Sequence, residues 1–244
     1  MKNVLILGCS HSRGSYSLSN TIRDKGEEYT AFNLGGWWAH CDYIKDMNKR
    51  IYAGGGVGWF WYAEVILSIL ESQTLKYYDM CIIQETIEPR FHISNQTECT
   101  KEKYKDFNAE LIDFNVSVNS FFSNQFQNMD YIIKSQFPKT HISKDFYVAI
   151  SGESNTYKTA TYLSKLFVSN LMQEYQIPTY TFQMGDKVGT SDYFIDLELT
   201  NMYEKSTIKE RTSDAHGAHL NIHGNKILGN KISNALRKKQ NVRI

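Results

Sequence analysis

Ser10 is the first residue whose type and position suggest chemistry. It follows Gly8 and the apolar run Val4–Leu7, and an apolar run without charges is typical of a strand buried on both faces of a parallel sheet. Gly8 allows a sharp exit from that strand. Ser10 and its neighbour Cys9 are therefore expected at the strand's carboxyl end, where open α/β sheets place their functional groups. The alternative is that Ser10 only caps the next helix.

A second group of chemistry-bearing residues lies near the end of the chain. The segment Asp214–Asn225 precedes an amphipathic stretch and contains His216, His219 and His223. Their spacing of three and four would bring three imidazoles to one face of a helix, as metal ligands are arranged. Two glycines within the segment argue against an uninterrupted helix. A metal site is therefore the alternative interpretation of this segment, and the expected cofactor is none.

The elements that must position these residues alternate between strands and helices, which predicts a parallel sheet covered on both faces. We expect an α/β fold with three layers, α/β/α, and a five-stranded, mostly parallel sheet. The predicted strands are Val4–Leu7, Glu28–Leu34, Asp79–Gln84, Phe146–Ile150 and Ile177–Phe182. The predicted helices are Ser15–Lys25, Trp61–Leu70, Lys101–Asp113, Val116–Lys134, Ala160–Leu171 and Ile222–Lys238. Residues 1–244 are expected to form a single domain, with a polar, partly helical, insertion-like stretch around 91–140.

Composition narrows the environment and the partners. The formal net charge of +1 gives no strong field toward nucleic acid or an anionic membrane. The apolar run before Gly8 is too short for a signal peptide, and no run approaches the roughly 20 residues that span a bilayer, so a cytoplasmic location is expected. The four cysteines show no CxxC spacing and are expected to be reduced thiols.

Both ends of the chain together resemble the SGNH (GDSL-like) hydrolase superfamily, which has a flavodoxin-like fold. That family carries a serine in a Gly-Asp-Ser-like block after its first strand and an Asp-x-x-His block before its C-terminal helix. Here Gly8-Cys9-Ser10 matches the first block with Cys9 in place of the aspartate, and His219-Leu220-Asn221-Ile222-His223-Gly224 matches the histidine end of the last block. The resemblance implies that Ser10 is the nucleophile and that His219 is the base that takes its proton.

The group that holds the His219 imidazole is less clearly indicated. The family's acid would fall three residues before His219, and His216 stands at that position. Asp214 lies two residues further back and could orient the imidazole instead. A backbone carbonyl could also do so, which would leave a Ser-His dyad. Cys9 and Ser154 are alternative nucleophiles, and Cys9 would need neighbours that stabilise a thiolate.

The resemblance also implies an oxyanion hole, which usually makes the largest contribution to catalysis. Its first two donors would be the amide of Ser10 and that of Gly35 or Gly36, which follow the second predicted strand. The family's third donor is an asparagine after the third strand. Glu88 falls about there in this chain, and an ionised carboxylate cannot donate a hydrogen bond.

Other residues near these blocks could complete the site. Thr86 or Arg90 could replace the missing asparagine as a donor. Arg90 could equally bind a carboxylate or phosphate of the substrate through its planar guanidinium. Trp37, directly after the glycine pair, could bind substrate or could be a buried core residue.

The sequence thus predicts a serine esterase that removes acetyl or another small acyl group through an acyl-enzyme. Its expected partner is a small-molecule or glycan ester. The aromatic content of 14% fits a surface that stacks sugars, and equally a rich core. The alternatives are a sugar O-acyltransferase on the same fold and a non-catalytic carbohydrate-binding or structural relative.

Overall fold

The core of the protein is a seven-stranded sheet in the order β6-β7-β4-β1-β5-β8-β9. The computed structural model describes residues 1–14, 21–24, 27–30, 35–54, 57–85, 97–116, 155–183, 194–199, 220 and 222–241. The strands are β1 (Asn3–Gly8), β4 (Asn48–Ala53), β5 (Met80–Glu85), β6 (Thr97–Tyr104), β7 (Ala109–Val116), β8 (Thr179–Gln183) and β9 (Ile195–Asp196). Neighbouring strands run parallel except β6 and β7. The mostly parallel α/β sheet is confirmed, with seven strands instead of five.

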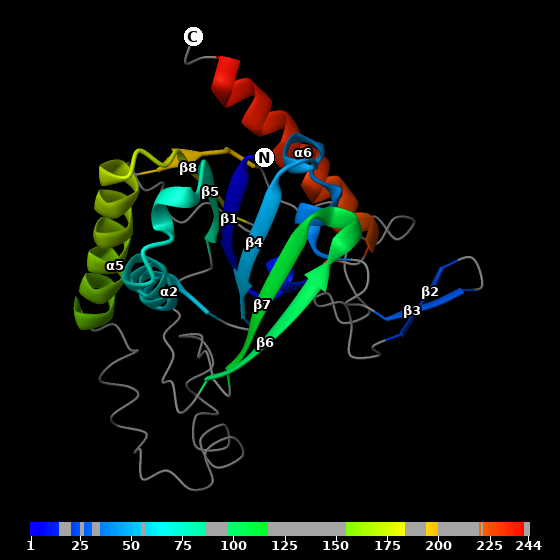
Figure 1. Cartoon of the computed structure of the whole chain (residues 1–244), viewed down its shortest axis with the longest axis horizontal. Helices are drawn as coiled ribbons and strands as arrows, with labels where there is room; N and C mark the ends of the chain where they lie inside the picture. Colours follow the sequence, from blue (N-terminus) through cyan, green and yellow to red (C-terminus); the bar gives the residue numbers. More distant parts are fainter. Residues whose placement is uncertain are drawn as a thin grey trace, which may run out of the picture.

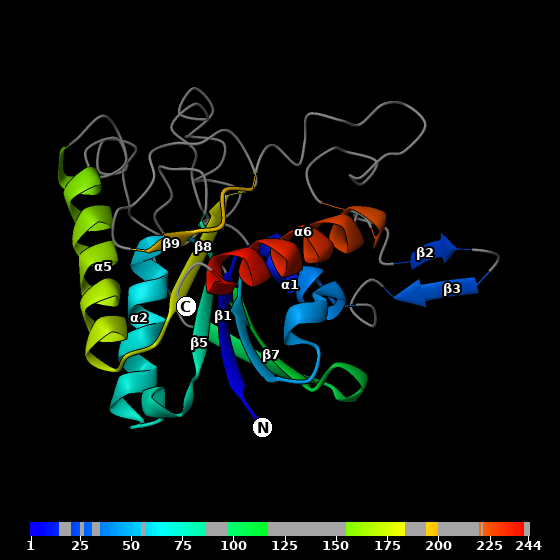
Figure 2. The same ribbon diagram turned by 90° about the horizontal axis from the view of Figure 1, so that it is seen from above.

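Helices cover both faces of this sheet and give the three expected layers (Figures 1 and 2). On one face α2 (Trp59–Glu71) packs against α5 (Asn155–Glu174). On the other, α6 (Ile222–Asn241) lies against the short 3-10 helices η2 (Trp37–His40) and η3 (Asp42–Ile44). The helices predicted around 61–70, 160–171 and 222–238 are confirmed.

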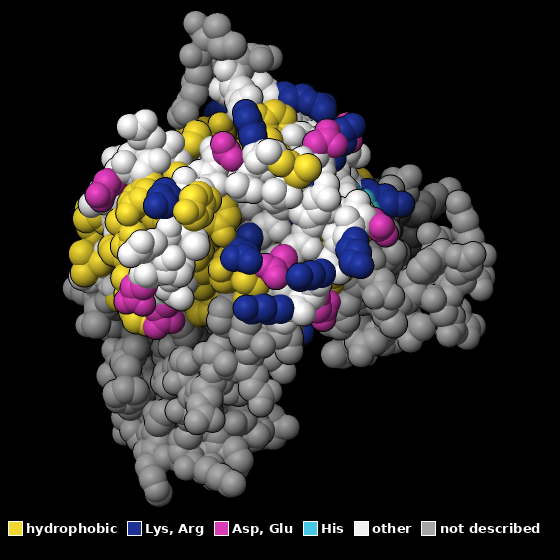
Figure 3. Space-filling view, in the orientation of Figure 1, with side chains coloured by type: hydrophobic (Ala, Val, Ile, Leu, Met, Phe, Trp, Pro, Cys, Tyr) yellow, Lys and Arg dark blue, Asp and Glu magenta, His cyan; other side chains and the backbone are white. Residues whose placement is uncertain are grey.

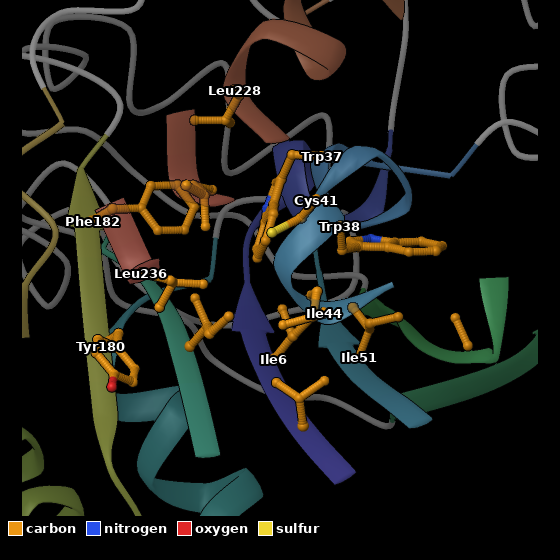
Figure 4. Packing of buried hydrophobic residues seen from close by; sticks show 14 of the residues in the cluster. Ile6, Trp37, Trp38, Cys41, Ile44, Ile51, Tyr180, Phe182, Leu228 and Leu236 are labelled. Atoms are coloured by element: carbon orange, nitrogen blue, oxygen red, sulfur yellow. The ribbon is translucent and has the colours of Figure 1, made fainter. Parts of the chain in front are cut away.

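Successive side chains of β1 are buried in two different hydrophobic clusters, one on each face of the sheet. Val4 and Ile6 belong to the cluster under α6, whereas Leu5 and Leu7 belong to the cluster under α2 and α5. Successive side chains of a strand point to opposite faces, so a run without polar residues is needed where both faces are covered. Figure 4 shows the first cluster, in which side chains of β1, β4, β8, η2 and α6 meet.

The strand β4 was not predicted, because Lys49 and Arg50 interrupt its apolar pattern. Lys49 is nonetheless buried, and its ammonium group donates to the carbonyl oxygens of Lys45 (3.0 Å), Met47 (3.0 Å) and Phe107 (2.7 Å). Three acceptors satisfy its donors, which is how a buried ammonium is tolerated. Burial also lowers the pKa of Lys49 to about 8.

The expected second strand, Glu28–Leu34, does not enter the main sheet. Its residues 28–30 lie in β3 (Glu27–Thr30), which pairs antiparallel with β2 (Thr21–Asp24) in a separate two-stranded sheet. The helix expected over Ser15–Lys25 is wrong for residues 21–24, where the β-branched pair Thr21 and Ile22 favours extended backbone. The remainder of both segments lies outside the described residues.

The helix expected over Lys101–Asp113 is also wrong. Residues 97–116 form the antiparallel hairpin β6–β7, closed by the 3-10 turn η5 (Lys105–Phe107) and by Asn108 in a left-handed conformation, at φ +49°. The polar stretch around 91–140 is therefore a strand hairpin in its described part. The predicted helix at 116–134 and the predicted strand at 146–150 lie outside the described residues, apart from Val116, which ends β7.

The strand order places a topological switch point beside β1. From β1 the chain passes to β4 on one side, and then crosses to β5 on the other side of β1. Crevices open at the carboxyl ends of the strands where the order reverses in this way, and they are where open α/β sheets bind ligands. Ser10 is the second residue after β1, so the backbone at the predicted nucleophile lies at this edge.

The surface has two further features. Hydrophobic side chains gather over α2 and α5 on the left of Figure 3, and the large exposed ones there are Phe60, Leu67, Tyr162, Leu163 and Phe167. A hollow of about 710 Å³ lies at the opposite edge from Ser10, between the amino ends of β1 and β4 and the β6–β7 turn. Among the described helices, none is long and apolar enough to cross a membrane.

Candidate functional site

The turn after β1 is held by backbone hydrogen bonds. Ser10 begins the short helix α1 (Ser10–Arg13), and the carbonyl oxygen of Cys9 accepts hydrogen bonds from the amides of Ser12 (2.9 Å) and Arg13 (3.0 Å). The chain therefore forms one helical turn next to the end of the strand. The backbone of Ser10 is described, and its side chain lies outside the described atoms.

Gly8 is required here because Ser12 folds back onto it. A Cβ atom at residue 8 would lie 2.1 Å from Ser12 Oγ and 2.2 Å from Ser12 Cβ. Any other residue would push α1 away from the end of β1. The glycine expected to permit a sharp turn therefore acts by permitting close approach.

Ser12 is the centre of a buried hydrogen-bond network that joins three distant segments. The Trp37 indole Nε1–H donates to Ser12 Oγ (2.8 Å), and the Ser12 hydroxyl donates to Gln84 Oε1 (2.6 Å). The Trp38 indole Nε1–H donates to the carbonyl oxygen of Ser12 (2.7 Å). Tyr62 Oη–H donates to the carbonyl oxygen of Gln84 (2.8 Å) and holds the end of β5 from the other side. The network fixes α1 relative to η2 and β5.

The structure brings the predicted glycine pair to the Ser10 turn. A Cβ atom at Gly36 would lie 2.8 Å from the carbonyl oxygen of Ser12 and 3.1 Å from that of His11. Gly14, at φ +82°, leaves α1 in a left-handed conformation, and its Cβ position is 2.9 Å from the carbonyl carbon of Gly35. Gly35 is itself at φ +68°. Glycine is needed at Gly36 for the close approach, and at Gly14 and Gly35 for the close approach and for the left-handed backbone.

Trp37 is a core residue. Its ring is fully buried and meets Phe182 edge to face, with 5.3 Å between ring centroids, and Figure 4 shows it beside Cys41. The predicted contact of Trp37 with substrate is therefore replaced by an indirect connection to the site, through Ser12. The physical reason is the apolar surface of the indole, which is covered by η2, β8 and α6.

The end of β5 carries a second polar group that the sequence did not identify as part of a site. Glu85 faces α5, and its side chain is 4% exposed. Gln183 Nε2–H donates to Glu85 Oε2 (2.9 Å), and Lys165 Nζ lies 3.8 Å from the same oxygen. Lys165 Nζ also lies 5.2 Å from the centre of the Trp59 ring. Gln84 and Glu85 are consecutive, so they face opposite sides of the sheet.

These polar residues had a weak signal in the sequence. An apolar run that ends in two polar residues, as Met80–Glu85 does, reads as a strand followed by its exit. The predicted strand ended at Gln84, whereas β5 also includes Glu85, and the two residues are 1% and 6% exposed. A buried polar side chain needs a partner, and here the partners come from residues far away in the sequence.

The start of α6 lies close to the core beneath the site. Leu220 is buried in the cluster that contains Trp37, and its carbonyl oxygen accepts a hydrogen bond from Asn225 Nδ2 (3.2 Å). A Cβ atom at Gly229 would lie 2.6 Å from the carbonyl oxygen of Trp37 and 2.7 Å from that of His40. The glycine lets α6 press directly against the backbone of η2.

Several predicted site residues lie outside the described residues, and so their roles remain predictions. These are His219, Asp214, His216, Thr86 and Arg90, with Glu88 and Ser154 among the alternatives. For His223 the structure describes the backbone alone. Within the described part of the chain, no group of three His, Cys, Asp or Glu side chains is arranged to hold a metal ion.

The described cysteines are free thiols enclosed in the core. Cys9, Cys41 and Cys81 are buried and unpaired with one another. Burial raises the pKa of the Cys41 thiol to about 11, and it raises the pKa of Cys81 further. The side chain of Cys99 is outside the described atoms. Cys41 and Cys81 therefore carry protonated, unreactive thiols at neutral pH.

Comparison of the sequence with known protein families and with curated proteins gives no match. A solved structure, the crystal structure of a lipase from a goat rumen metagenome, is similar in its chain trace. The two chains are 11% identical, the alignment covers 98% of this chain and 97% of the lipase, and the TM-score is 0.48. At this level the likeness bears on neither substrate nor mechanism.

Proposed function

We propose that this protein is a serine ester hydrolase of the SGNH type, which removes acetyl or another small acyl group from a carbohydrate. The observation that carries the proposal is the position of the Ser10 backbone. It lies at the carboxyl end of β1, beside the switch point, with Gly35 and Gly36 in close contact with the same turn. The Ser10 turn and the glycine pair are the features of the described residues that support the proposal.

In the proposed reaction, Ser10 Oγ attacks the carbonyl carbon of the ester while His219 takes the hydroxyl proton. The negative charge that develops on the carbonyl oxygen is stabilised by backbone amides, those of Ser10 and of Gly35 or Gly36. The intermediate collapses, the sugar hydroxyl leaves with the proton from His219, and an acyl group remains on Ser10. Water then attacks the acyl-enzyme by the same route in reverse and releases the free acid.

The remaining assignments follow the same proposal. Asp214 or His216 would hold the imidazole of His219, and Thr86 or Arg90 would add a polar contact to the substrate. The carbohydrate preference rests on the resemblance, because all four tryptophans of the chain are buried. The reaction needs no metal or cofactor, because the nucleophile, the base and the donors all come from the polypeptide.

The test is hydrolysis of p-nitrophenyl acetate by the wild type and by Ser10→Ala. We expect Ser10→Ala to reduce the rate to that of the reaction without enzyme. Ser68→Ala, which changes an exposed serine of α2, is the matched control and should keep the wild-type rate. Activity that survives in Ser10→Ala would contradict the nucleophile assignment. Adding a sugar acceptor tests for transfer, since a transferase would form the sugar ester faster than free acetate.

A further inference from the structure

The hollow at the amino ends of β1 and β4 is lined mainly by polar and basic side chains. Its volume of about 710 Å³ falls within the range of roughly 300–1,000 Å³ that is typical of small-molecule sites. Figure 3 shows Lys and Arg side chains gathered around acidic ones over β4, β7 and β6. The hollow and the Ser10 turn lie at opposite edges of the sheet, so a ligand bound here would be separate from the proposed catalytic site.

Among the described residues, two lysines of the hollow have no charged partner. Arg50, Glu110 and Lys103 are neighbours across β4, β7 and β6, and the Glu110 carboxylate pairs with the Arg50 guanidinium. Lys49 is enclosed, and its ammonium donates to three backbone carbonyl oxygens. Lys103 and Lys105 are exposed, and no carboxylate of the described residues lies within ion-pair distance of either. Two positive charges are therefore available to an anion.

A phosphate monoester matches this charge. At neutral pH it carries about two negative charges, and its three oxygens are strong hydrogen-bond acceptors. An ionised carboxylate carries a single charge and would leave one of the two lysines unpaired. Two ammonium groups can donate charge-assisted hydrogen bonds to one phosphate, and such bonds are stronger than those between neutral groups.

The same hollow contains an aromatic ring and an open carboxamide. Tyr77 ends the short 3-10 helix η4 (Leu75–Tyr77) and is 60% exposed. Asn3 Nδ2 donates to the carbonyl oxygen of Tyr77 (2.8 Å), and Asn48 Nδ2 donates to Asn3 Oδ1 (3.0 Å). Among the described residues, nothing further binds the exposed Asn48 carboxamide, which keeps an oxygen acceptor and one N–H. Nucleic-acid bases stack on tyrosine rings and pair with carboxamides along their edges, so an aromatic base fits here better than a sugar ring.

We infer that the hollow binds a nucleoside monophosphate. Lys103 and Lys105 donate hydrogen bonds to its phosphate, and its base stacks on the Tyr77 ring with one edge toward Asn48. This inference does not rest on the proposed function, and its test requires no catalytic activity.

The experiment is isothermal titration calorimetry at low ionic strength, because salt screens exposed charges. The probes are adenosine monophosphate, ribose 5-phosphate, which lacks the base, and adenosine, which lacks the phosphate. We expect adenosine monophosphate to bind with a Kd of about 1 mM or below. Each of the two fragments should bind at least about tenfold more weakly, since each loses one of the two sets of contacts.

Variants separate the phosphate contacts from the stacking contact. Lys103→Gln and Lys105→Gln should each weaken the binding of adenosine monophosphate by about tenfold or more, and the Kd should then depend less on salt. Tyr77→Ala should weaken binding by about 5- to 100-fold and leave the salt dependence unchanged. Lys238→Gln on the exposed side of α6 and Tyr162→Ala on α5 are the matched controls, and both should bind as the wild type does.

Three results would overturn the inference. The first is the absence of saturable binding at about 10 mM adenosine monophosphate. The second is an affinity for ribose 5-phosphate equal to that for adenosine monophosphate, which would mean that the base makes no contact and that a sugar phosphate is an equal occupant. The third is a loss of affinity in Lys238→Gln as large as that in Lys103→Gln, which would indicate general attraction to positive charge.

Discussion

Replacing Ser12 by alanine tests whether the buried network holds the Ser10 turn in place. The change removes the hydroxyl that accepts from Trp37 Nε1 at 2.8 Å and donates to Gln84 Oε1 at 2.6 Å. Both partners stay buried, at 0% and 1% exposure, and lose their hydrogen bond. A buried polar group left without a partner costs about 1–3 kcal/mol, so the two together cost about 2–6 kcal/mol. That is a large part of the roughly 5–15 kcal/mol that stabilises a domain.

The measurement is urea unfolding followed by far-UV circular dichroism, which does not depend on the tryptophans that the network contains. Ser68→Ala removes an exposed hydroxyl and should change the free energy of unfolding by less than about 0.5 kcal/mol. Trp37→Phe removes the indole donor, so combining it with Ser12→Ala should cost clearly less than the sum of the single changes. A loss below about 1 kcal/mol for Ser12→Ala, or strict additivity in the double variant, would refute the network as described.

Three further changes have directions that the structure fixes. Gly229→Ala should destabilise the protein by about 1–3 kcal/mol in thermal unfolding, because the new Cβ would lie 2.6 Å from the η2 backbone. Alanine at other positions of a helix interior is favourable, so the control Asn230→Ala, on the exposed side of α6, should not destabilise the protein. Iodoacetamide at pH 8 should leave Cys41 and Cys81 unlabelled in the native protein and should label both in guanidinium, because burial raises the pKa of each thiol and blocks access to it. Labelling is read by peptide mass spectrometry, and rapid labelling of the native protein would contradict this prediction. The pKa of Lys49 is lowered to about 8 from its ordinary value of 10.5, so between these pH values the unfolded chain binds more protons than the folded protein. The free energy of unfolding of the wild type should therefore rise relative to that of Lys49→Met as the pH increases through this window. A difference in unfolding free energy that does not change with pH would argue against the buried ammonium.

The parts of the fold that the sequence predicted are those whose signal is local. The strands β1, β5 and β8 and the helices α2, α5 and α6 follow from apolar runs or helical periodicity, which depend only on near neighbours in the chain. The strand β4 was missed because it contains Lys49, a charged residue that is buried by donating to backbone carbonyls, including that of Phe107. The hairpin β6–β7 was missed because charged residues alternate with its apolar residues. Such charges are tolerated only in the assembled structure.

The candidate site divides in the same way. The Ser10 turn could be predicted, because a glycine after a buried strand has a local reason. The glycine pair does contact this turn, but the strand predicted before it pairs in a separate sheet, so its position depends on the tertiary structure. The catalytic interpretation of Ser10 and His219 came from the resemblance and remains a proposal. Trp37 could not be assigned to the core from its neighbours alone, since a tryptophan after two glycines fits either a wall of the site or the interior.

By itself, the sequence determined where the chain turns and which segments must be buried, because backbone freedom at glycine and the apolar character of a strand are local properties. Only the tertiary structure decided what supports the Ser10 turn. Ser12 and Gln84 are 72 residues apart and Ser12 and Trp37 are 25 apart, and neither pair has a periodic signal. Their hydrogen bonds depend on the register of β5 against β1 and on the packing of η2 under α6, which arise only when the whole sheet is assembled.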